Sequence, residues 1–116
     1  MAELYQLDYG YKVKVLNGKN KNKEGYLVYC SCFGDVCIDT KKRPDGNYKI
    51  REFPLNLEIL ARDNPFKIKN KERDLSNFDC AKFSLLIYNP KKILENKKYF
   101  TQDFINSAKS SIKSLK

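Results

Sequence analysis

A short alternating run followed by a glycine- and lysine-rich loop most constrains how this chain can fold. Residues Tyr11–Leu16 alternate apolar and basic side chains, as a half-buried strand does. Residues 17–25 form a polar loop of residue types that tolerate positive φ. Tyr26–Cys30 is a continuous apolar run, typical of a strand covered on both faces. The pattern predicts a β-hairpin with two basic side chains outward, Lys12 and Lys14, and three side chains inward, Tyr11, Val13 and Val15.

Three further strands are predicted before residue 62. They cover Asp35–Thr40, Tyr48–Phe53 and Leu57–Leu60. A turn at residues 41–47 contains Pro-Asp-Gly, in which proline presets φ and Asp-Gly supplies a left-handed tip. Pro54 ends the fourth strand, and a short 3₁₀-type turn is expected at Leu55-Asn56. Five short strands with turn signals between them indicate a small β-barrel.

The segment from Tyr9 to Val28 resembles the KOW motif of large-subunit ribosomal proteins and NusG-type elongation factors. Gly25 occupies the near-obligatory glycine of that motif, and Gly18 with Lys19 opens its loop. Asn22 stands where many members carry glycine, and asparagine also accepts the left-handed conformation. The resemblance covers about residues 8–61 and implies a five-stranded SH3-like barrel over residues 1–61. Gly25 is then expected at positive φ or beneath a crowded strand crossing.

The second half of the chain has a different pattern and completes an α+β fold. Residues 62–74 are a basic connector, and residues 75–116 are expected to be a helical extension. Residues 75–88 fit either a helix or an alternating strand, and we favour the helix. Further helices are predicted at Lys91–Lys98 and after Thr101, where an apolar stripe would face a partner surface. We predict that residues 75–116 pack on the barrel as an ordered part of the same fold; the alternative is a tail that orders only on binding.

The charge of the chain narrows its possible functions. The net charge is +9; residues 1–61 carry 10 basic and 8 acidic groups, and residues 62–116 carry 13 and 6. A surface this basic favours a polyanionic or acidic partner. Histidine, the commonest general base near neutral pH, is absent, so we expect no enzyme. We find neither a signal peptide nor a membrane-length apolar run, which predicts a cytoplasmic protein without membrane contact.

Two lysine-rich loops are the candidate contact sites. The KOW resemblance implies that the first loop touches RNA phosphates, and alternating lysines on a turn can reach successive phosphates. The alternative for both loops is a solvated hairpin tip. The predicted contact residues are Lys19, Lys21, Lys23, Lys41, Lys42 and Arg43. Aromatic rings could also stack on unpaired bases, and the candidates are Tyr9, Tyr26 and Phe33. The alternative for these rings is a place in the core or at the rim of the barrel.

These features predict a KOW-type module that binds RNA or a ribonucleoprotein. The alternative is a small phage-type inhibitor or accessory protein that modulates a nucleic-acid-handling enzyme. We expect no cofactor. The four cysteines lack the two close pairs of a structural zinc site and are expected to be buried reduced thiols: Cys30, Cys32, Cys37 and Cys80.

Overall fold

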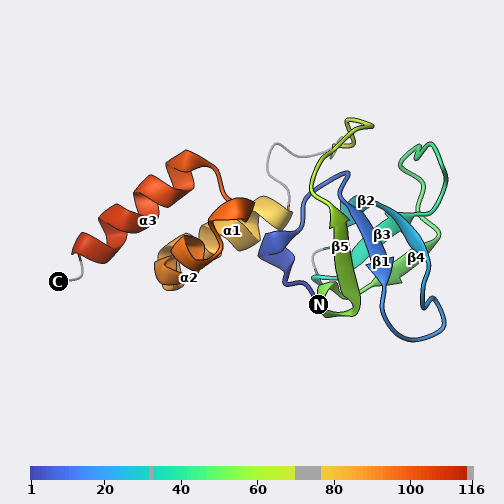
Figure 1. Ribbon diagram of the computed structural model, residues 1–116, viewed down its shortest axis with the longest axis horizontal. Coiled ribbons are helices and arrows are strands. Elements are labelled where there is room, and N and C mark those ends of the chain that lie inside the picture. The colour runs from blue at the N-terminus through green and yellow to red at the C-terminus, as the bar shows by residue number, and fades with distance from the viewer. Residues whose placement is uncertain (32, 70–76, 115–116) are drawn as a thin grey trace.

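Among the described residues, five antiparallel strands form one sheet in the N-terminal half of the chain (Figure 1). The computed structural model describes residues 1–31, 33–69 and 77–114. The strand order is β4-β3-β2-β1-β5, so consecutive strands lie side by side until the last one returns to β1. The strands are β1 (Lys12–Val15), β2 (Glu24–Cys30), β3 (Val36–Asp39), β4 (Ile50–Glu52) and β5 (Leu57–Ala61).

The alternation in the first strand has the predicted outcome. Val13 and Val15 are fully buried, whereas Lys12 and Lys14 are partly exposed. The second strand begins two residues earlier than expected, and its Tyr29 is 40% exposed, so β2 is not covered on both faces throughout. The prediction of five strands in an α+β chain is confirmed.

A 3₁₀ turn over Pro54–Asn56 separates β4 from β5, as the proline predicted. The fourth strand is shorter than the expected Tyr48–Phe53, because pairing with β3 covers only Ile50–Glu52. A second 3₁₀ turn at Leu4–Gln6 was not foreseen. It precedes β1 and packs beside the first helix.

Three α-helices follow the sheet within the part of the chain that the structure describes. They are α1 (Asn77–Tyr88), α2 (Pro90–Glu95) and α3 (Gln102–Ser114), with a 3₁₀ turn at Lys97–Tyr99. The helical interpretation of residues 77–88 is therefore correct and the strand alternative is wrong. The predicted helix Lys91–Lys98 instead ends at Glu95 and tightens into the 3₁₀ turn. Two further apolar side chains of this half lie outside the described residues: Leu75, which the sequence predicts to pack with the first helix, and Leu115, the last member of the predicted apolar stripe after Thr101.

The helices and the sheet share one hydrophobic cluster. Phe78 of α1 is fully buried against the sheet, and its ring meets Tyr9 edge-on at 5.0 Å. The Asn77 side-chain amide donates to the Cys30 carbonyl at 2.7 Å. Lys82, which is nearly buried, pairs with Asp8 at 3.2 Å. These contacts hold α1 against the strands and the N-terminal segment.

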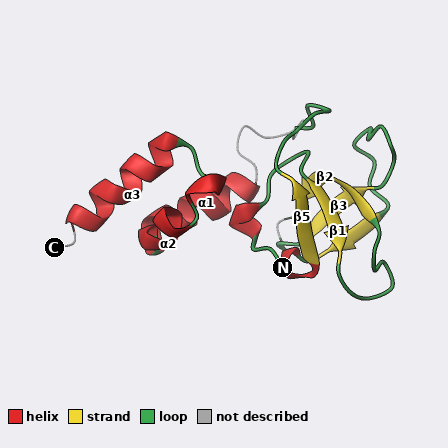
Figure 2. Ribbon diagram, viewed as in Figure 1, coloured by secondary structure: helices red, strands yellow, loops and turns green. Residues whose placement is uncertain are grey.

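A second cluster joins the three helices to one another. Ile93, Ile105 and Ala108 are its buried members, with partly buried side chains of α1 around them. The molecule is elongated, with extents of 48 × 29 × 24 Å. Figures 1 and 2 show the helices at one side of the sheet and two long strand-connecting loops at the other. Within the described residues, no helix has the length and apolarity that crossing a membrane requires.

Candidate nucleic-acid interface

The strand register brings the two predicted basic loops to the same end of the sheet. Tyr26, which opens β2 just after the first loop, pairs with Asp39, which closes β3 just before the second. Both loops therefore leave the sheet at one end of the β2–β3 pair. They project from the side of the molecule opposite the helices (Figure 1).

The β1–β2 loop, residues 16–23, has the left-handed positions that its sequence predicted. Gly18 has φ of 89° and Asn22 has φ of 71°. The Val15 amide donates to the Lys23 carbonyl at 2.9 Å, and the Asn22 amide donates to the Val15 carbonyl at 2.8 Å. This closed loop leaves three lysine side chains exposed, those of Lys19, Lys21 and Lys23.

A polar network ties this loop to the β4–β5 corner. Asn20 is 6% exposed, and its amide donates to Glu52 Oε1 at 3.1 Å. Asn56 donates to the other oxygen of the same carboxylate at 2.9 Å. Lys23 Nζ donates to Asn20 Oδ1 at 3.2 Å. Sequence reasoning missed these anchoring residues, because contacts between residues 32 positions apart leave no local pattern.

The β3–β4 loop, residues 40–49, is organised by the buried carboxylate of Asp39. Its two oxygens accept the backbone amides of Lys41 and Asp45, both at 3.0 Å. Lys41 Nζ also contacts the Asp45 carboxylate at 2.9 Å, and this contact, with the Asn47 amide, lowers the pKa of Asp45 to about 2. An Asp two residues before a lysine cluster is the signal that could have identified this turn.

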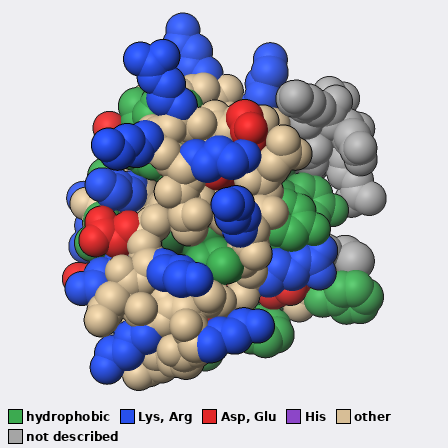
Figure 3. Space-filling view, turned by 90° about the vertical axis from the view of Figure 1, so that its right-hand side faces the viewer, with side chains coloured by type: hydrophobic (Ala, Val, Ile, Leu, Met, Phe, Trp, Pro, Cys, Tyr) green, Lys and Arg blue, Asp and Glu red, His purple; other side chains and the backbone are tan. Residues whose placement is uncertain are grey.

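Most of the predicted contact residues keep their charge available. Only Lys41 among the six is in an ion pair with a described residue. The other five are exposed: Lys19, Lys21, Lys23, Lys42 and Arg43. Figure 3 shows this end of the molecule covered by many Lys and Arg side chains and few acidic ones. Such a surface suits an extended polyanion.

The three predicted stacking residues lie in different environments. Tyr9 is 8% exposed and belongs to the core. Tyr26 is half-buried and packs edge-on against Phe66 at 5.0 Å. Phe33 is 86% exposed, but it lies in the β2–β3 loop, at the end of β2 away from the basic loops. The structure therefore does not join these aromatic rings and the lysines into one surface.

Gly25 lies beneath a crowded strand crossing, the second of the two expected environments, and its φ is not positive. A Cβ atom there would lie 2.5 Å from the Asp39 carbonyl oxygen and 2.6 Å from Ile38 Cγ2. Only a residue without a side chain allows β2 and β3 to approach this closely.

The cysteines divide into buried and exposed thiols. Burial raises the pKa of Cys30 to about 12 and also raises that of Cys37. Cys80 is exposed on α1, so the expectation that it is buried is wrong, because this face of the helix has no covering element among the described residues. Cys32 lies outside the described residues. Across the described ranges, no three potential metal ligands lie together.

No protein-family model matches the chain, and no curated protein matches its sequence. The candidate interface is therefore identified from the residues of this chain alone. Its two loops are held in place by Asp39 and Glu52, and their lysines face outward. This arrangement can bind anions.

Proposed function

We propose that this chain is a non-enzymatic nucleic-acid-binding module of the KOW type, acting on RNA or a ribonucleoprotein in the cytoplasm. Its two basic loops would grip phosphates at one end of the sheet. The observation that carries the proposal is the β2–β3 register, because it brings both lysine clusters to that end. Of the six predicted contact residues, Lys41 alone pairs with a described acidic residue. Phosphate contacts of this kind release counterions and supply most of the affinity.

The connection between the edge strands supports an SH3-like barrel. In a flat five-stranded sheet β4 and β5 would lie about 19 Å apart, four spacings of ~4.8 Å. The chain passes from Glu52 to Leu57 in five residue steps that include the 3₁₀ turn. Such a segment spans less than about 16 Å. A sheet that curls so that its edges approach fits this short connection, which supports the proposed barrel.

A salt titration of RNA binding tests the proposal. Fluorescence anisotropy with a labelled RNA should show log K falling linearly with log salt concentration. The double variant Lys19→Gln/Lys21→Gln should reduce the magnitude of that slope by about one for each phosphate that the variant no longer neutralises. The matched control is Lys109→Gln/Lys113→Gln on α3, which removes the same charge at the other end of the molecule. No RNA binding at low salt, or an equal effect of both double variants, contradicts the proposal.

Exposed apolar side chains on the helical side favour a second candidate function. Ile87 and Tyr88 of α1 are 71% and 83% exposed, and Phe83 is 43% exposed. An apolar surface of this kind suits a protein partner. The chain would then be a small phage-type inhibitor or accessory protein of a nucleic-acid-handling enzyme. Purification of the tagged chain from its host distinguishes the two: one stoichiometric enzyme favours this function, and RNA or ribosomes alone favour the first.

A further inference from the structure

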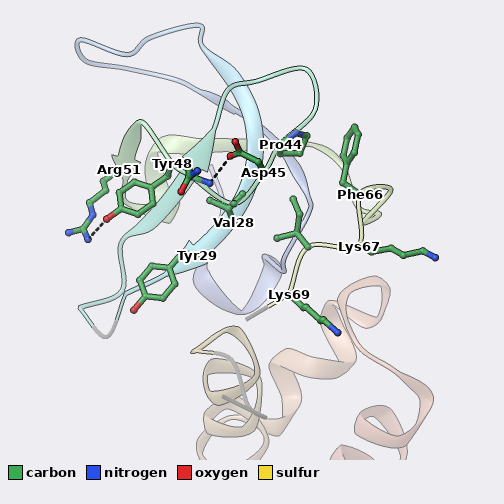
Figure 4. Close-up of a pocket in the computed structure, with 12 residues that line it drawn as sticks. Val28, Tyr29, Pro44, Asp45, Tyr48, Arg51, Phe66, Lys67 and Lys69 are labelled. Atoms are coloured by element: carbon green, nitrogen blue, oxygen red, sulfur yellow. Dashed lines mark hydrogen bonds between the residues drawn. The ribbon is translucent and has the colours of Figure 1, made fainter. Parts of the chain in front are cut away.

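A groove of about 660 Å³ lies between the β3–β4 loop and the segment that follows β5 (Figure 4). Strands β2 and β4 contribute Val28, Tyr29 and Arg51, and the loop contributes residues 44–48. Residues 66–69 form the opposite wall. Its volume falls within the ~300–1,000 Å³ typical of ligand pockets.

Three aromatic side chains line this groove and remain accessible. Tyr29 is 40% exposed, Tyr48 is 43% exposed and Phe66 is 39% exposed. Arg51 holds Tyr48 in place: its Nη2 donates to the phenol oxygen at 3.1 Å, and the guanidinium lies 5.4 Å from the ring centroid. The groove therefore presents accessible aromatic rings, and the ring of Tyr48 has a fixed orientation.

The charge of the groove is positive. Arg51, Lys67 and Lys69 line it. Arg51 Nη1 lies 3.9 Å from an Asp35 carboxylate oxygen, and Asp45, the acidic side chain in the lining, is paired with Lys41. Lys67 and Lys69 are exposed and make no ion pair with a described residue. Figure 4 shows both lysine side chains extending outward from the rim. The ammonium groups of Lys67 and Lys69 are therefore available to pair with an anionic group at the rim.

The wall formed by residues 66–69 is held by a local turn, and its Ile68 packs against the hydrophobic core. Asn64 donates to the Ile68 carbonyl at 2.7 Å and accepts the Ile68 amide at 2.9 Å. The turn is possible because Gly10 has no side chain, since a Cβ there would overlap Asn64. Within it Lys67 has φ of 53°, a left-handed conformation that a non-glycine residue keeps only when its surroundings enforce it.

We propose that this groove binds unpaired nucleotides of single-stranded RNA, an inference that rests on the proposed function. Bases stack on the aromatic walls, and the flanking phosphates contact Lys67 and Lys69. Residues 44–47 of the β3–β4 loop line the groove, so a strand held at the basic loops continues into it. A duplex cannot enter in this way, because its bases are already stacked on one another.

The variant Tyr48→Leu tests the groove, with Tyr88→Leu as the matched control. Tyr88 is exposed on α1 and is not part of the groove. The probes are a labelled single-stranded oligouridylate and an RNA hairpin duplex of equal charge. Loss of one base stack should weaken binding of the single strand by at least about fivefold and leave duplex affinity unchanged. Tyr88→Leu should change neither affinity.

A second variant, Lys67→Gln, tests the groove without removing any of its aromatic side chains. It should reduce the magnitude of the salt slope for the single strand by about one. Thermal melts of all variants should match that of the wild type. If Lys19→Gln/Lys21→Gln weakens RNA binding while Tyr48→Leu and Lys67→Gln do not, the proposal that the groove binds single-stranded RNA is overturned and the proposed function stands. If the wild type binds neither RNA, or binds only an acidic peptide, both are overturned.

Discussion

Gly18 and Gly25 are both needed near the β1–β2 loop, but for different physical reasons. Gly18 has a left-handed φ of 89°, and apart from its two chain neighbours no described residue has an atom within 4 Å of the place where a Cβ would stand. Gly25 has no unusual φ, yet its missing Cβ leaves room for the Asp39 carbonyl and the Ile38 side chain. The first is a conformational requirement and the second is a steric one.

We expect Gly25→Ala to lower the free energy of unfolding by about 1–3 kcal/mol, the usual range for overpacking a close contact. Urea unfolding of the wild type and the variant measures this change. Gly18→Asn is the control and should cost less than Gly25→Ala, because asparagine visits the left-handed region more readily than other residues with a side chain. Equal midpoints for Gly25→Ala and the wild type would show that β2 and β3 do not approach as closely as we describe.

At the scale of elements, the β3–β4 loop makes a prediction about pH. The ammonium of Lys41 and the Asn47 amide favour the ionised form of Asp45 and lower the pKa of its carboxyl from 3.8 to about 2. The contribution of this contact to loop order is therefore complete above about pH 4 and is lost as pH falls through 2. Carbon-13 NMR of the Asp45 carboxyl should show a midpoint near 2 in the wild type.

The variant Lys41→Met should return that midpoint toward 3.8, since it removes the largest cause of the shift. The Asn47 amide would still donate to the carboxylate at 2.9 Å and keep part of the effect. A wild-type midpoint already near 3.8 would mean that the loop is open in solution. Lys41 would then be as available to a polyanion as Lys42.

The elements of this chain could be predicted to different degrees. Alternation in residues 11–16 and proline at position 54 predicted a strand and a turn, because both signals act within a few residues. The anchoring of the loops by Asp39 and Glu52 could not be predicted, since it depends on which strands become neighbours. The segment around Phe66 was expected to be a basic connector, yet it folds back onto Tyr26. Its charge was visible in the sequence and its contacts were not.

At the scale of the whole molecule, α1 belongs to both hydrophobic clusters. Phe78 near its start is fully buried among strand residues, and Leu85 and Leu86 near its end pack with α2 and α3. The Lys82–Asp8 pair lies between these two ends and joins the helix to the N-terminal segment. The helix therefore couples the stability of the sheet to that of the C-terminal half.

We expect Phe78→Ala to cost about 3–5 kcal/mol of stability, because it leaves a cavity within the core of the sheet. Amide hydrogen exchange should then accelerate together in the strands and in α1, since both pack against the same buried ring. Phe83→Ala is the control on the same helix; its ring is 43% exposed and contacts Phe104 of α3. That variant should accelerate exchange mainly in the helices. If Phe78→Ala leaves the strands fully protected while the helices exchange freely, the sheet is stable alone and the C-terminal half orders separately, as a partner-dependent tail would.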